Sequence, residues 1–420
     1  MSRRHHLALI TLLLATCCNT AEWHPDPSDK RLKIRVVWSA ADSTQNYSAT
    51  LAGANAAKNT DAFKKLAGED FEVDDTQDPD DALEAAREVD EIRLNPRVLA
   101  VIGHSRSSST RSAVRFYAEA GIPVLMPSAT SPYALYQFRE DAPWPSVDQL
   151  GKDPYPRFVN VFRLPPSDVP HQVNALKLTI RELSGLPSEA NVMLICDVTK
   201  RGGADIYTKP ICDSLRAETE LKTKFARYRE FDLDTSDIYG LVTEIHSVKV
   251  HYIAFIGYPQ LALELLQELK ERTQKDEALS NYTFIMSDAC FTNELINFDP
   301  TVKVYVTSFI KPLEDLSCPS TPSLKTDEPY AFDAVMILGT AARSCKDRHS
   351  LDRNCIRQYL EDHRYLKGTC DKYDIHDGER QNAEYQVYER CGDQFQRHWS
   401  ARFDEKVLRE HAKWCSTNSK

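Results

Sequence analysis

The stretch from Val98 to Ala134 constrains the fold more than any other part of the chain. It opens with an uninterrupted apolar run over 98–102, which is typical of a strand buried on both faces of a parallel sheet. A hydroxyl-rich turn and a helical pattern follow from Ser107 onward, and a second apolar run covers 122–126 before the hydroxyl-rich turn 128–130. The order strand, turn, helix, strand, turn predicts a parallel α/β sheet.

Both hydroxyl-rich turns follow strands of this predicted sheet. Ligands of open parallel sheets bind beyond the carboxyl ends of the strands, so the two turns would lie side by side at that edge. Hydroxyls and backbone N–H groups at two helix starts form a neutral cradle for an anion such as a carboxylate. Ordinary helix capping is the alternative explanation for either turn taken alone. The two turns together favour a ligand site.

The sequence VIGHSRSSSTRSA…GIPVLMPSATSPYA resembles the type I periplasmic binding protein family, in particular its branched-chain amino-acid-binding members. It is also similar to the ligand-binding regions of class C receptors. The resemblance extends from about Lys33 to about Phe395 and implies an α/β fold of two Rossmann-like lobes, joined by three crossover strands around a central ligand cleft. The implied parts are a first lobe over 32–164 plus 312–366, a second lobe over 165–311 plus 367–396, and a charged tail over 397–420.

Composition limits the partners of the chain. The formal net charge is −10, which argues against nucleic acid or an anionic membrane as a general partner. No later segment reaches the roughly 20 apolar residues of a transmembrane helix, so we do not expect a complete class C receptor. Neither CxxC nor HExxH occurs. We therefore predict no zinc site and no cofactor.

The N-terminus has the pattern of an export signal, which we place over 1–21. Arg3 and Arg4 precede a short apolar segment that cannot span a bilayer. Leu14-Ala15-Thr16-Cys17 resembles a bacterial lipobox, which implies lipidation at Cys17. Cleavage near Ala21 by an ordinary signal peptidase is the alternative. Either way we predict a periplasmic or extracytoplasmic protein that touches the membrane only through a lipid anchor.

Eleven cysteines in an exported chain suggest disulfides. Cys345 and Cys355 flank a polar loop, and Cys370 and Cys391 bracket a predicted hairpin. These are the two pairs that we expect, although the sequence cannot fix the connectivity.

Three further expectations concern the path of the chain. The acidic run 74–78 lacks the pattern of a calcium loop, and we interpret it as a solvated turn that caps the next helix. Asp377-Gly378 is a turn signal, with 385–388 as the return strand. The second and third crossings between the lobes are expected at 310–312 and 366–368.

The resemblance assigns ligand contacts to the two turns, and the ligand's α-carboxylate to the first of them. Ser107 would hold the carboxylate with its hydroxyl and backbone N–H. In the second turn, beside Ser128, Thr130 would offer its hydroxyl and N–H, and Ala129 its backbone carbonyl.

The opposite end of the ligand is assigned to the other lobe. Tyr258 matches an aromatic residue that closes over the α-carbon, and Asp288 matches the acid that pairs with the α-ammonium. A structural role in a turn remains the alternative for Tyr258, and helix capping remains the alternative for Asp288.

Some residues depart from the family pattern. Arg106 replaces a small or Cys residue beside the first turn, and Trp38 ends the first strand where the family has a loop near the ligand. Arg106 with Lys200 or Arg201 would suit an anionic or polar ligand side chain. The alternative is that these three cations face solvent.

Three functions remain open at this point. The first is an exported solute-binding protein that delivers an amino acid or a similar small polar ligand to an ABC permease. The second is a ligand-sensing subunit that presents the closed form to a membrane partner. The third, much weaker, is a serine hydrolase, because Gly103-His104-Ser105-Arg106-Ser107 imitates a nucleophile elbow but lacks its second glycine.

Overall fold

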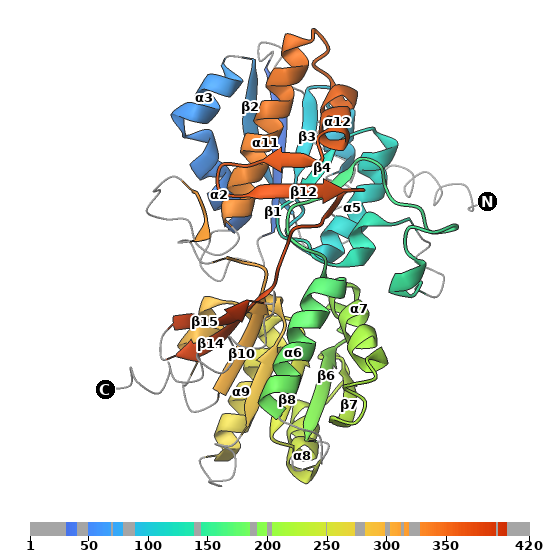
Figure 1. The fold of residues 1–420 in the computed structure, drawn as a ribbon, viewed down its shortest axis with the longest axis vertical. Coiled ribbons are helices and arrows are strands. Elements are labelled where there is room, and N and C mark those ends of the chain that lie inside the picture. The colour runs from blue at the N-terminus through green and yellow to red at the C-terminus, as the bar shows by residue number, and fades with distance from the viewer. Residues whose placement is uncertain are drawn as a thin grey trace, which may run out of the picture.

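The computed structural model places most of the chain in two lobes, which lie one above the other in Figure 1. The described residues are 31–39, 49–68, 70–78, 89–137, 144–184, 191–199, 204–248, 250–273, 282–298, 303–311, 315–318, 328–391 and 394–400. The predicted signal 1–21, Cys17, Lys200 and Arg201 lie outside these residues.

The upper lobe is built on a five-stranded parallel sheet with the order β2-β1-β3-β4-β5. Every residue of β3 is buried, as the apolar run predicts for a strand covered on both faces. The strands are β1 (Leu32–Ser39), β2 (Phe71–Asp78), β3 (Val98–Ile102), β4 (Val124–Met126) and β5 (Val161–Arg163). The helices around them are α2 (Ala49–Lys58), α3 (Asp61–Ala67), α5 (Ser107–Glu119), α11 (Glu328–Asp347) and α12 (Arg353–Asp362).

The lower lobe has a seven-stranded sheet with the order β15-β14-β10-β9-β8-β6-β7. Strands β10, β9, β8, β6 and β7 are parallel to one another. Strand β14 pairs antiparallel with β10, and β15 pairs antiparallel with β14. The strands are β6 (Val192–Asp197), β7 (Phe225–Phe231), β8 (Tyr252–Ile256), β9 (Thr283–Met286), β10 (Lys303–Ser308), β14 (Gln386–Cys391) and β15 (Gln394–Ser400). The helices are α6 (Val173–Ser184), α7 (Ala204–Ala217), α8 (Ile238–Val248), α9 (Pro259–Thr273) and α10 (Asn293–Asn297).

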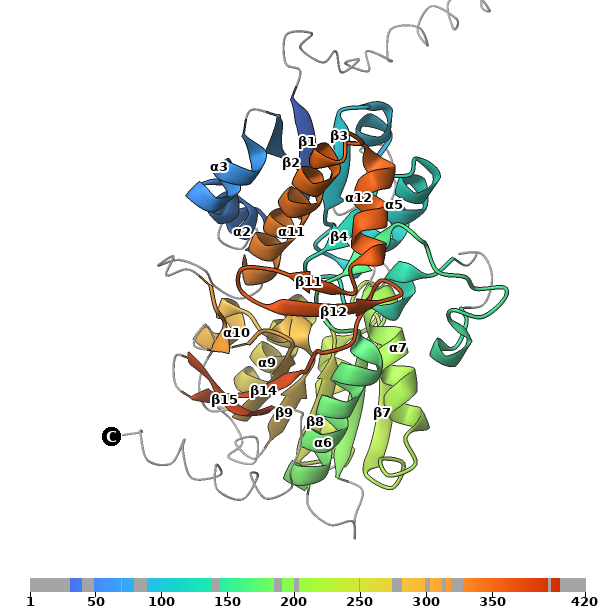
Figure 2. The same cartoon turned by 45° about the horizontal axis from the view of Figure 1, so that its top comes forward.

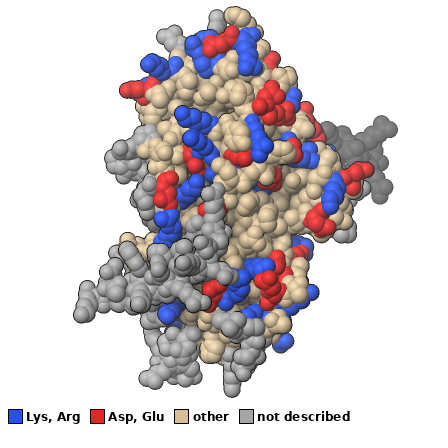
Figure 3. Space-filling model, in the orientation of Figure 1, with Lys and Arg blue, Asp and Glu red and all other residues tan. Residues whose placement is uncertain are grey.

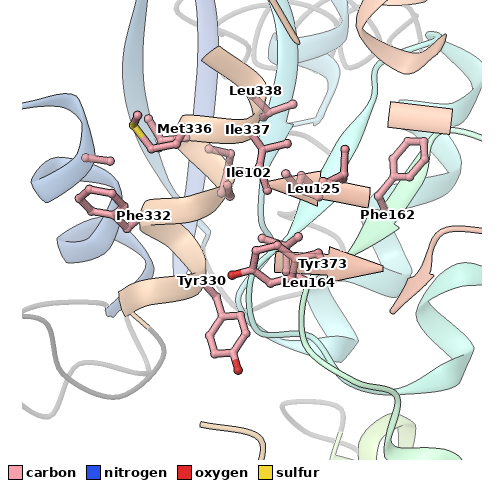
Figure 4. Packing of buried hydrophobic residues seen from close by; sticks show 14 of the residues in the cluster. Ile102, Leu125, Phe162, Leu164, Tyr330, Phe332, Met336, Ile337, Leu338 and Tyr373 are labelled. Carbon is pink, nitrogen blue, oxygen red and sulfur yellow. The ribbon is translucent and has the colours of Figure 1, made fainter. Parts of the chain in front are cut away.

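Helix α11 seals one face of the upper sheet, and Figure 4 shows its side chains against those of the strands. Phe332 and Ile337 are nearly inaccessible and share a cluster with Ile102 and Leu125. A Cβ on Gly53 of α2 would lie 2.1 Å from the Glu328 carbonyl oxygen, so glycine is required where α2 and α11 meet. The predicted α/β class with buried parallel sheets is confirmed.

A small three-stranded sheet corrects the expected path of the last crossing. Strands β11 (Tyr365–Lys367), β12 (Lys372–His376) and β13 (Glu379–Arg380) lie along the base of the upper lobe in Figure 2. Tyr373 belongs to the same core cluster as Phe332. The chain therefore enters the lower lobe only with β14, not at 366–368, because the hairpin first buries its apolar side chains against α11.

The Asp377-Gly378 turn is present, and both residues have positive φ angles of 49° and 71°. Its return strand is β13, not 385–388, which mostly belongs to β14. Strand β15 pairs with β14 as far as Ser400. The expected tail boundary at residue 397 therefore falls inside a strand.

The acidic run 74–78 is not a turn, because β2 continues through it to Asp78. Arg35 of β1 donates to both carboxylate oxygens of Asp74, at 2.7 and 2.8 Å. Lys33 also pairs with Asp74, at 3.2 Å. Cationic residues on the neighbouring strand therefore compensate acids that would otherwise disfavour a strand.

Three disulfides have both partners among the described residues. Cys345–Cys355 joins α11 to α12 as expected. Cys370 is bonded to Cys318 and not to Cys391, which shows that the hairpin spacing was a poor guide to pairing. Cys196–Cys212 joins β6 to α7.

The surface carries both signs of charge. On the face shown in Figure 3, lysine and arginine are interspersed with aspartate and glutamate and form no large area of one sign. None of the helices in the described part of the chain is long and apolar enough to cross a membrane.

Candidate functional site

Both predicted turns lie at the carboxyl edge of the upper sheet. Gly103 ends β3 with φ = +136°, and a Cβ there would lie 2.4 Å from the Val37 carbonyl oxygen of β1. Only glycine fits this conformation and this approach. It lets the chain turn into α5, whose first residue is Ser107.

Helix α5 begins without a side-chain cap, since Arg106 at its N-cap position makes no capping hydrogen bond. The N–H groups of the first helical turn have no partner within the helix, and they favour an anion there. The Ser107 hydroxyl oxygen accepts from the Ser131 N–H at 3.2 Å. Its own hydrogen is therefore available for donation.

The second turn, 127–131, is fixed by its own neighbours. The Ser128 hydroxyl donates to the Ser105 carbonyl at 2.8 Å, which ties the two turns together. Ala129 and Thr130 are both buried, and the Thr130 carbonyl accepts from the Asp168 N–H at 3.0 Å.

Arg163 holds the second turn from behind. Its side chain is fully buried, and it donates to the carbonyl oxygens of Thr130 at 2.6 Å and Ser131 at 2.8 Å. The same guanidinium makes a bidentate ion pair with Glu379, from Nε to Oε2 at 3.2 Å and from Nη2 to Oε1 at 2.5 Å. Bidentate pairs of this kind fix geometry as well as charge. Arg163 therefore connects the turn to the β12–β13 hairpin.

Several contacts join the upper turns to the lower lobe, among them a hydrogen bond from the Asp168 N–H to the Thr130 carbonyl at 3.0 Å. The Ser131 hydroxyl donates to the Ile206 carbonyl of α7 at 2.8 Å. The Arg106 guanidinium lies 5.3 Å from the ring centroid of Tyr258. The predicted residues Arg106, Ser107 and Tyr258 thus all lie at the boundary between the two lobes.

Tyr258 leads to Asp288 through a second aromatic residue. The rings of Tyr258 and Tyr207 are stacked with centroids 5.5 Å apart. The Tyr207 hydroxyl donates to Asp288 Oδ1, and the Gln172 amide donates to the same oxygen at 2.9 Å. Asp288 therefore lies, partly exposed, among donors of the lower lobe.

Tyr385 joins the buried carboxyl group of Asp168 to that of Asp288. Its hydroxyl oxygen is 3.0 Å from Asp168 Oδ1 and 3.1 Å from Asp288 Oδ2. A tyrosine has a single O–H, so only one of these contacts can be donated by Tyr385. The other requires a proton on a carboxyl group. Two protons, the tyrosine's own and one on a carboxyl group, are therefore shared among Tyr385, Asp168 and Asp288.

The hydrogen-bond donors around Asp288 favour a proton on Asp168 over one on Asp288. Burial raises its pKa well above the usual range, and the charge of Asp288 raises it further. Burial also raises the pKa of Asp288, but hydrogen bonds from Tyr207, Gln172 and Tyr385 oppose that effect. Donors thus favour the ionised form at Asp288 and leave Asp168 neutral.

Comparison with known proteins was made by sequence and by structure. No protein-family model and no curated protein matches the sequence. A leucine-binding protein, LivK, from Thermotoga maritima is similar in structure, with 17% identity, a TM-score of 0.64, and coverage of 88% of this chain and 98% of that chain. A type 1 periplasmic binding protein from Bordetella pertussis has 15% identity, a TM-score of 0.63, and coverage of 88% and 100%. A fatty acid ABC transporter substrate-binding protein from Thermomonospora curvata has 10% identity, a TM-score of 0.61, and coverage of 91% and 95%.

The chain has the type I periplasmic binding protein fold. In this fold the boundary between the lobes lies at the carboxyl ends of both parallel sheets, where Ser107, Tyr258 and Asp288 are found. Trp38 is directed elsewhere, because its indole N–H donates to Asp75 of the edge strand β2 at 3.2 Å.

Within this type I fold, the residues around Ser105 do not form a nucleophile elbow. The Ser105 hydroxyl is 3.0 Å from the Thr50 hydroxyl, and the adjacent His104 ring lies 3.2 Å from the Tyr117 hydroxyl. In the part of the chain that the structure describes, no histidine hydrogen-bonds to Ser105. The solved structures similar to this chain carry the names of solute-binding proteins.

Sequence reasoning missed most of the hydrogen-bonding partners at this boundary. Arg163 is the last residue of the buried strand Val161–Arg163. A charged residue in a buried strand needs a partner, so its presence there could have been used to predict a buried ion pair. Gln172, Asp168 and Tyr385 carry no comparable signal, because they come together only through the crossings between the lobes.

Proposed function

We propose that this protein is an extracytoplasmic solute-binding protein that captures an amino acid or similar small polar ligand between its two lobes. The observation that carries the proposal is the meeting of the uncapped start of α5 with Tyr258 across the lobe boundary, through Arg106. Its partners would be the small ligand and an ABC permease that receives the closed form. A membrane sensor that receives the same form is the alternative partner.

The residues of the upper lobe would hold a carboxylate. The Ser107 hydroxyl and the N–H groups of the first turn of α5 supply donors, and the Thr130 N–H adds one from the second turn. Ala129 and Ser128 shape that turn. Tyr258 would cover the ligand when the lobes close by hinge motion around their connecting segments. The names of two similar structures, a leucine-binding and a fatty acid-binding protein, share a carboxylate ligand, which supports this assignment.

The direct test is identification of the ligand. Mass spectrometry of small molecules released from the denatured purified protein should recover a compound that bears a carboxylate. Recovery of a neutral sugar or a metal complex would contradict the proposed cradle. Finding nothing released, together with no thermal stabilisation by any carboxylate or amino acid, would contradict the solute-binding function itself.

Ser107→Val tests the cradle within the chain. Loss of one hydroxyl donor to a carboxylate costs about 1.5–3 kcal/mol, which is roughly a tenfold to hundredfold rise in Kd. Ser112→Ala is the matched control, because the Ser112 hydroxyl donates to the Ser108 carbonyl in the same helix at 3.2 Å. Calorimetric titration with the recovered ligand measures both variants. Equal affinities would remove Ser107 from the site.

The lipid anchor at Cys17 is a separate part of the proposal. Thr16 departs from the small residues usual before a lipidated cysteine, whereas the preceding Leu14-Ala15 fits. Intact-mass analysis of the mature protein, with palmitate labelling in the native host, should show a modified Cys17. An unmodified N-terminus that begins after Cys18 would instead show ordinary cleavage.

A further inference from the structure

One hydroxyl group, that of Tyr385, lies between two acidic side chains at the lobe boundary. Its oxygen is within hydrogen-bond distance of both Asp168 Oδ1 and Asp288 Oδ2. Since the tyrosine has one O–H, the second hydrogen must come from a carboxyl group. The cluster of Asp168, Asp288 and Tyr385 therefore carries one negative charge, where two ionised acids would carry two.

The surroundings of Asp168 favour a neutral carboxyl group there. Asp168 is 0% exposed, and its Oδ2 has no hydrogen-bond partner in the described part of the chain. An oxygen without a donor is far less costly on a neutral carboxyl group than on a carboxylate. Oδ1 of the protonated acid can donate to the Tyr385 oxygen, whose own hydrogen is then donated to Asp288.

The charges around Asp168 act in the same direction. Burial raises the pKa of Asp168 well above its usual range, and the charge of Asp288 raises it further. Arg163 favours the ionised form, but its guanidinium already pairs with Glu379. The charged and titratable groups that face Asp168 from neighbouring elements are Asp288 after β9, Arg163 of β5, Tyr207 of α7 and Tyr385 before β14.

Asp288 is the accessible member of the pair. Its side chain is partly exposed at the carboxyl end of β9. Oδ1 accepts from the Gln172 amide and the Tyr207 hydroxyl, and Oδ2 accepts from the Tyr385 hydroxyl. A carboxylate offers about four acceptor positions, so room for a further donor remains on Oδ2.

A second acceptor lies beside this carboxylate. The Gln172 amide donates to Asp288 through Nε2, and its Oε1 is buried without a hydrogen-bond partner in the region that the structure describes. An ionised acid next to an unused amide oxygen attracts a cationic donor. The ammonium group of an amino acid, the ligand class of the proposed function, is such a donor.

We propose that the ligand's ammonium group takes the place of the shared proton: when it binds beside Asp288, Asp168 ionises and its proton passes to solvent. One cation enters as another leaves, so the net charge of the cluster with its ligand does not change. The inference rests on the proposed solute-binding function and adds a pH dependence to its site. Affinity for an amino acid then rises with pH, because the complex holds fewer protons than the separate partners. A carboxylic acid without an amine leaves the proton in place.

The first test counts protons on the wild-type protein. Calorimetric titration in two buffers of different ionisation enthalpy, at pH 6, 7 and 8, gives the number released on binding. The probes are L-leucine, L-phenylalanine and L-glutamate, with any amino acid released from the purified protein, each beside the 2-hydroxy acid with the same side chain. An amino acid that binds should release up to one proton, and its Kd should fall by up to about tenfold per pH unit. The matching hydroxy acid should release none.

The outcomes of this titration separate the inference from the proposed function. An amino acid that binds without releasing a proton at any of the three pH values overturns the inference and leaves solute binding intact. Binding of hydroxy acids alone has the same consequence. If no probe binds and nothing is released from the denatured protein, the proposed function fails together with the inference.

Asp168→Asn tests the source of the proton. The amide can donate to the Tyr385 oxygen as the protonated acid does, but it has no proton to release. Proton release should therefore disappear, and the Kd of the amino acid should no longer fall as the pH rises. The readout is a number of protons per bound ligand, so a partial loss of folded protein does not affect it.

His171→Gln is the matched control. His171 lies on the same segment η3 (Asp168–Gln172), is partly exposed, and is of the residue type that titrates near neutral pH. Proton release should persist in His171→Gln. Release that persists in Asp168→Asn, or that disappears in His171→Gln, would show that the proton does not come from Asp168 and would overturn the inference.

Discussion

The upper-lobe side of the boundary is made of short hydroxyl side chains and the start of a helix, whereas the lower-lobe side is made of aromatic rings and buried carboxyl groups. The upper groups hold each other through few contacts and keep donors such as the Ser107 hydroxyl available. The lower groups use their hydrogen bonds on each other, as Asp288 does with Tyr207. The two sheets thus give an upper face that can bind an anion and a lower face whose polar groups mostly bond to one another.

The two faces also depend on different supports. The upper turn 127–131 relies on one buried cation, Arg163, which is anchored to Glu379 of the β12–β13 hairpin. On the lower side, the Asp288 carboxyl group is bonded to neutral donors from Gln172, Tyr207 and Tyr385. Substitutions should therefore affect the two faces by different amounts and with different pH dependence.

The largest effect is expected at Arg163. Arg163→Leu leaves the Glu379 carboxylate and two turn carbonyls without their partner, and breaking a buried pair costs about 3–5 kcal/mol of unfolding free energy. Arg364→Leu is the control, because its ion pair with Asp374 is exposed and worth at most about 1 kcal/mol. Urea unfolding of both variants measures the difference. Similar losses of unfolding free energy in the two variants would show that Arg163 does not stabilise the turn 127–131.

The next effect separates the two acids of the lower face. Asp288→Asn places an NH2 group among donors and should cost about 1–3 kcal/mol of stability. Asp168→Asn resembles the protonated carboxyl and should cost less than about 1 kcal/mol, since an amide can donate to the Tyr385 oxygen. Thermal unfolding at pH 7 compares them. A larger loss in Asp168→Asn than in Asp288→Asn would reverse our assignment of the proton.

The pH dependence follows from the same assignment. The pKa of Asp168 is raised in the folded protein, mainly by burial, so the folded state binds more protons than the unfolded state above the ordinary pKa of 3.8. The contribution of Asp168 to stability is therefore complete at low pH and is lost as the pH rises toward its folded pKa. Asp168→Asn should remove this part of the dependence of the unfolding free energy on pH. If the unfolding free energy of the variant depends on pH as that of the wild type does, Asp168 is not protonated in the folded protein.

The smallest effect is expected at Trp38, which the family resemblance places near the ligand. Its indole donates to Asp75 on the outer strand, and loss of one exposed hydrogen bond in Trp38→Phe should cost less than about 1 kcal/mol of stability. Ligand affinity should not change, as calorimetric titration can show. A clear loss of affinity would show that Trp38 contacts the ligand and that the binding site extends toward β2.

The sequence allowed the strand–turn–helix–strand unit to be predicted because its signals are local. An apolar run, a glycine and a cluster of hydroxyls specify β3, the turn and α5 without help from distant residues. Ser107 could be placed at the carboxyl edge for the same reason. The Cys345–Cys355 pair is also local, since only a short polar loop separates its members.

Tertiary structure alone decided which groups at the boundary are free. Asp288 is joined by Gln172, Tyr207 and Tyr385, which are 116, 81 and 97 positions away in the chain. The acidic strand β2 and the Cys318–Cys370 bond likewise depend on residues that are remote in sequence. The sequence by itself determined where polar residues follow buried strands, because that is a matter of local pattern. Their state of protonation and pairing was decided by the fold, because hydrogen bonds and burial depend on which segments the lobes bring together.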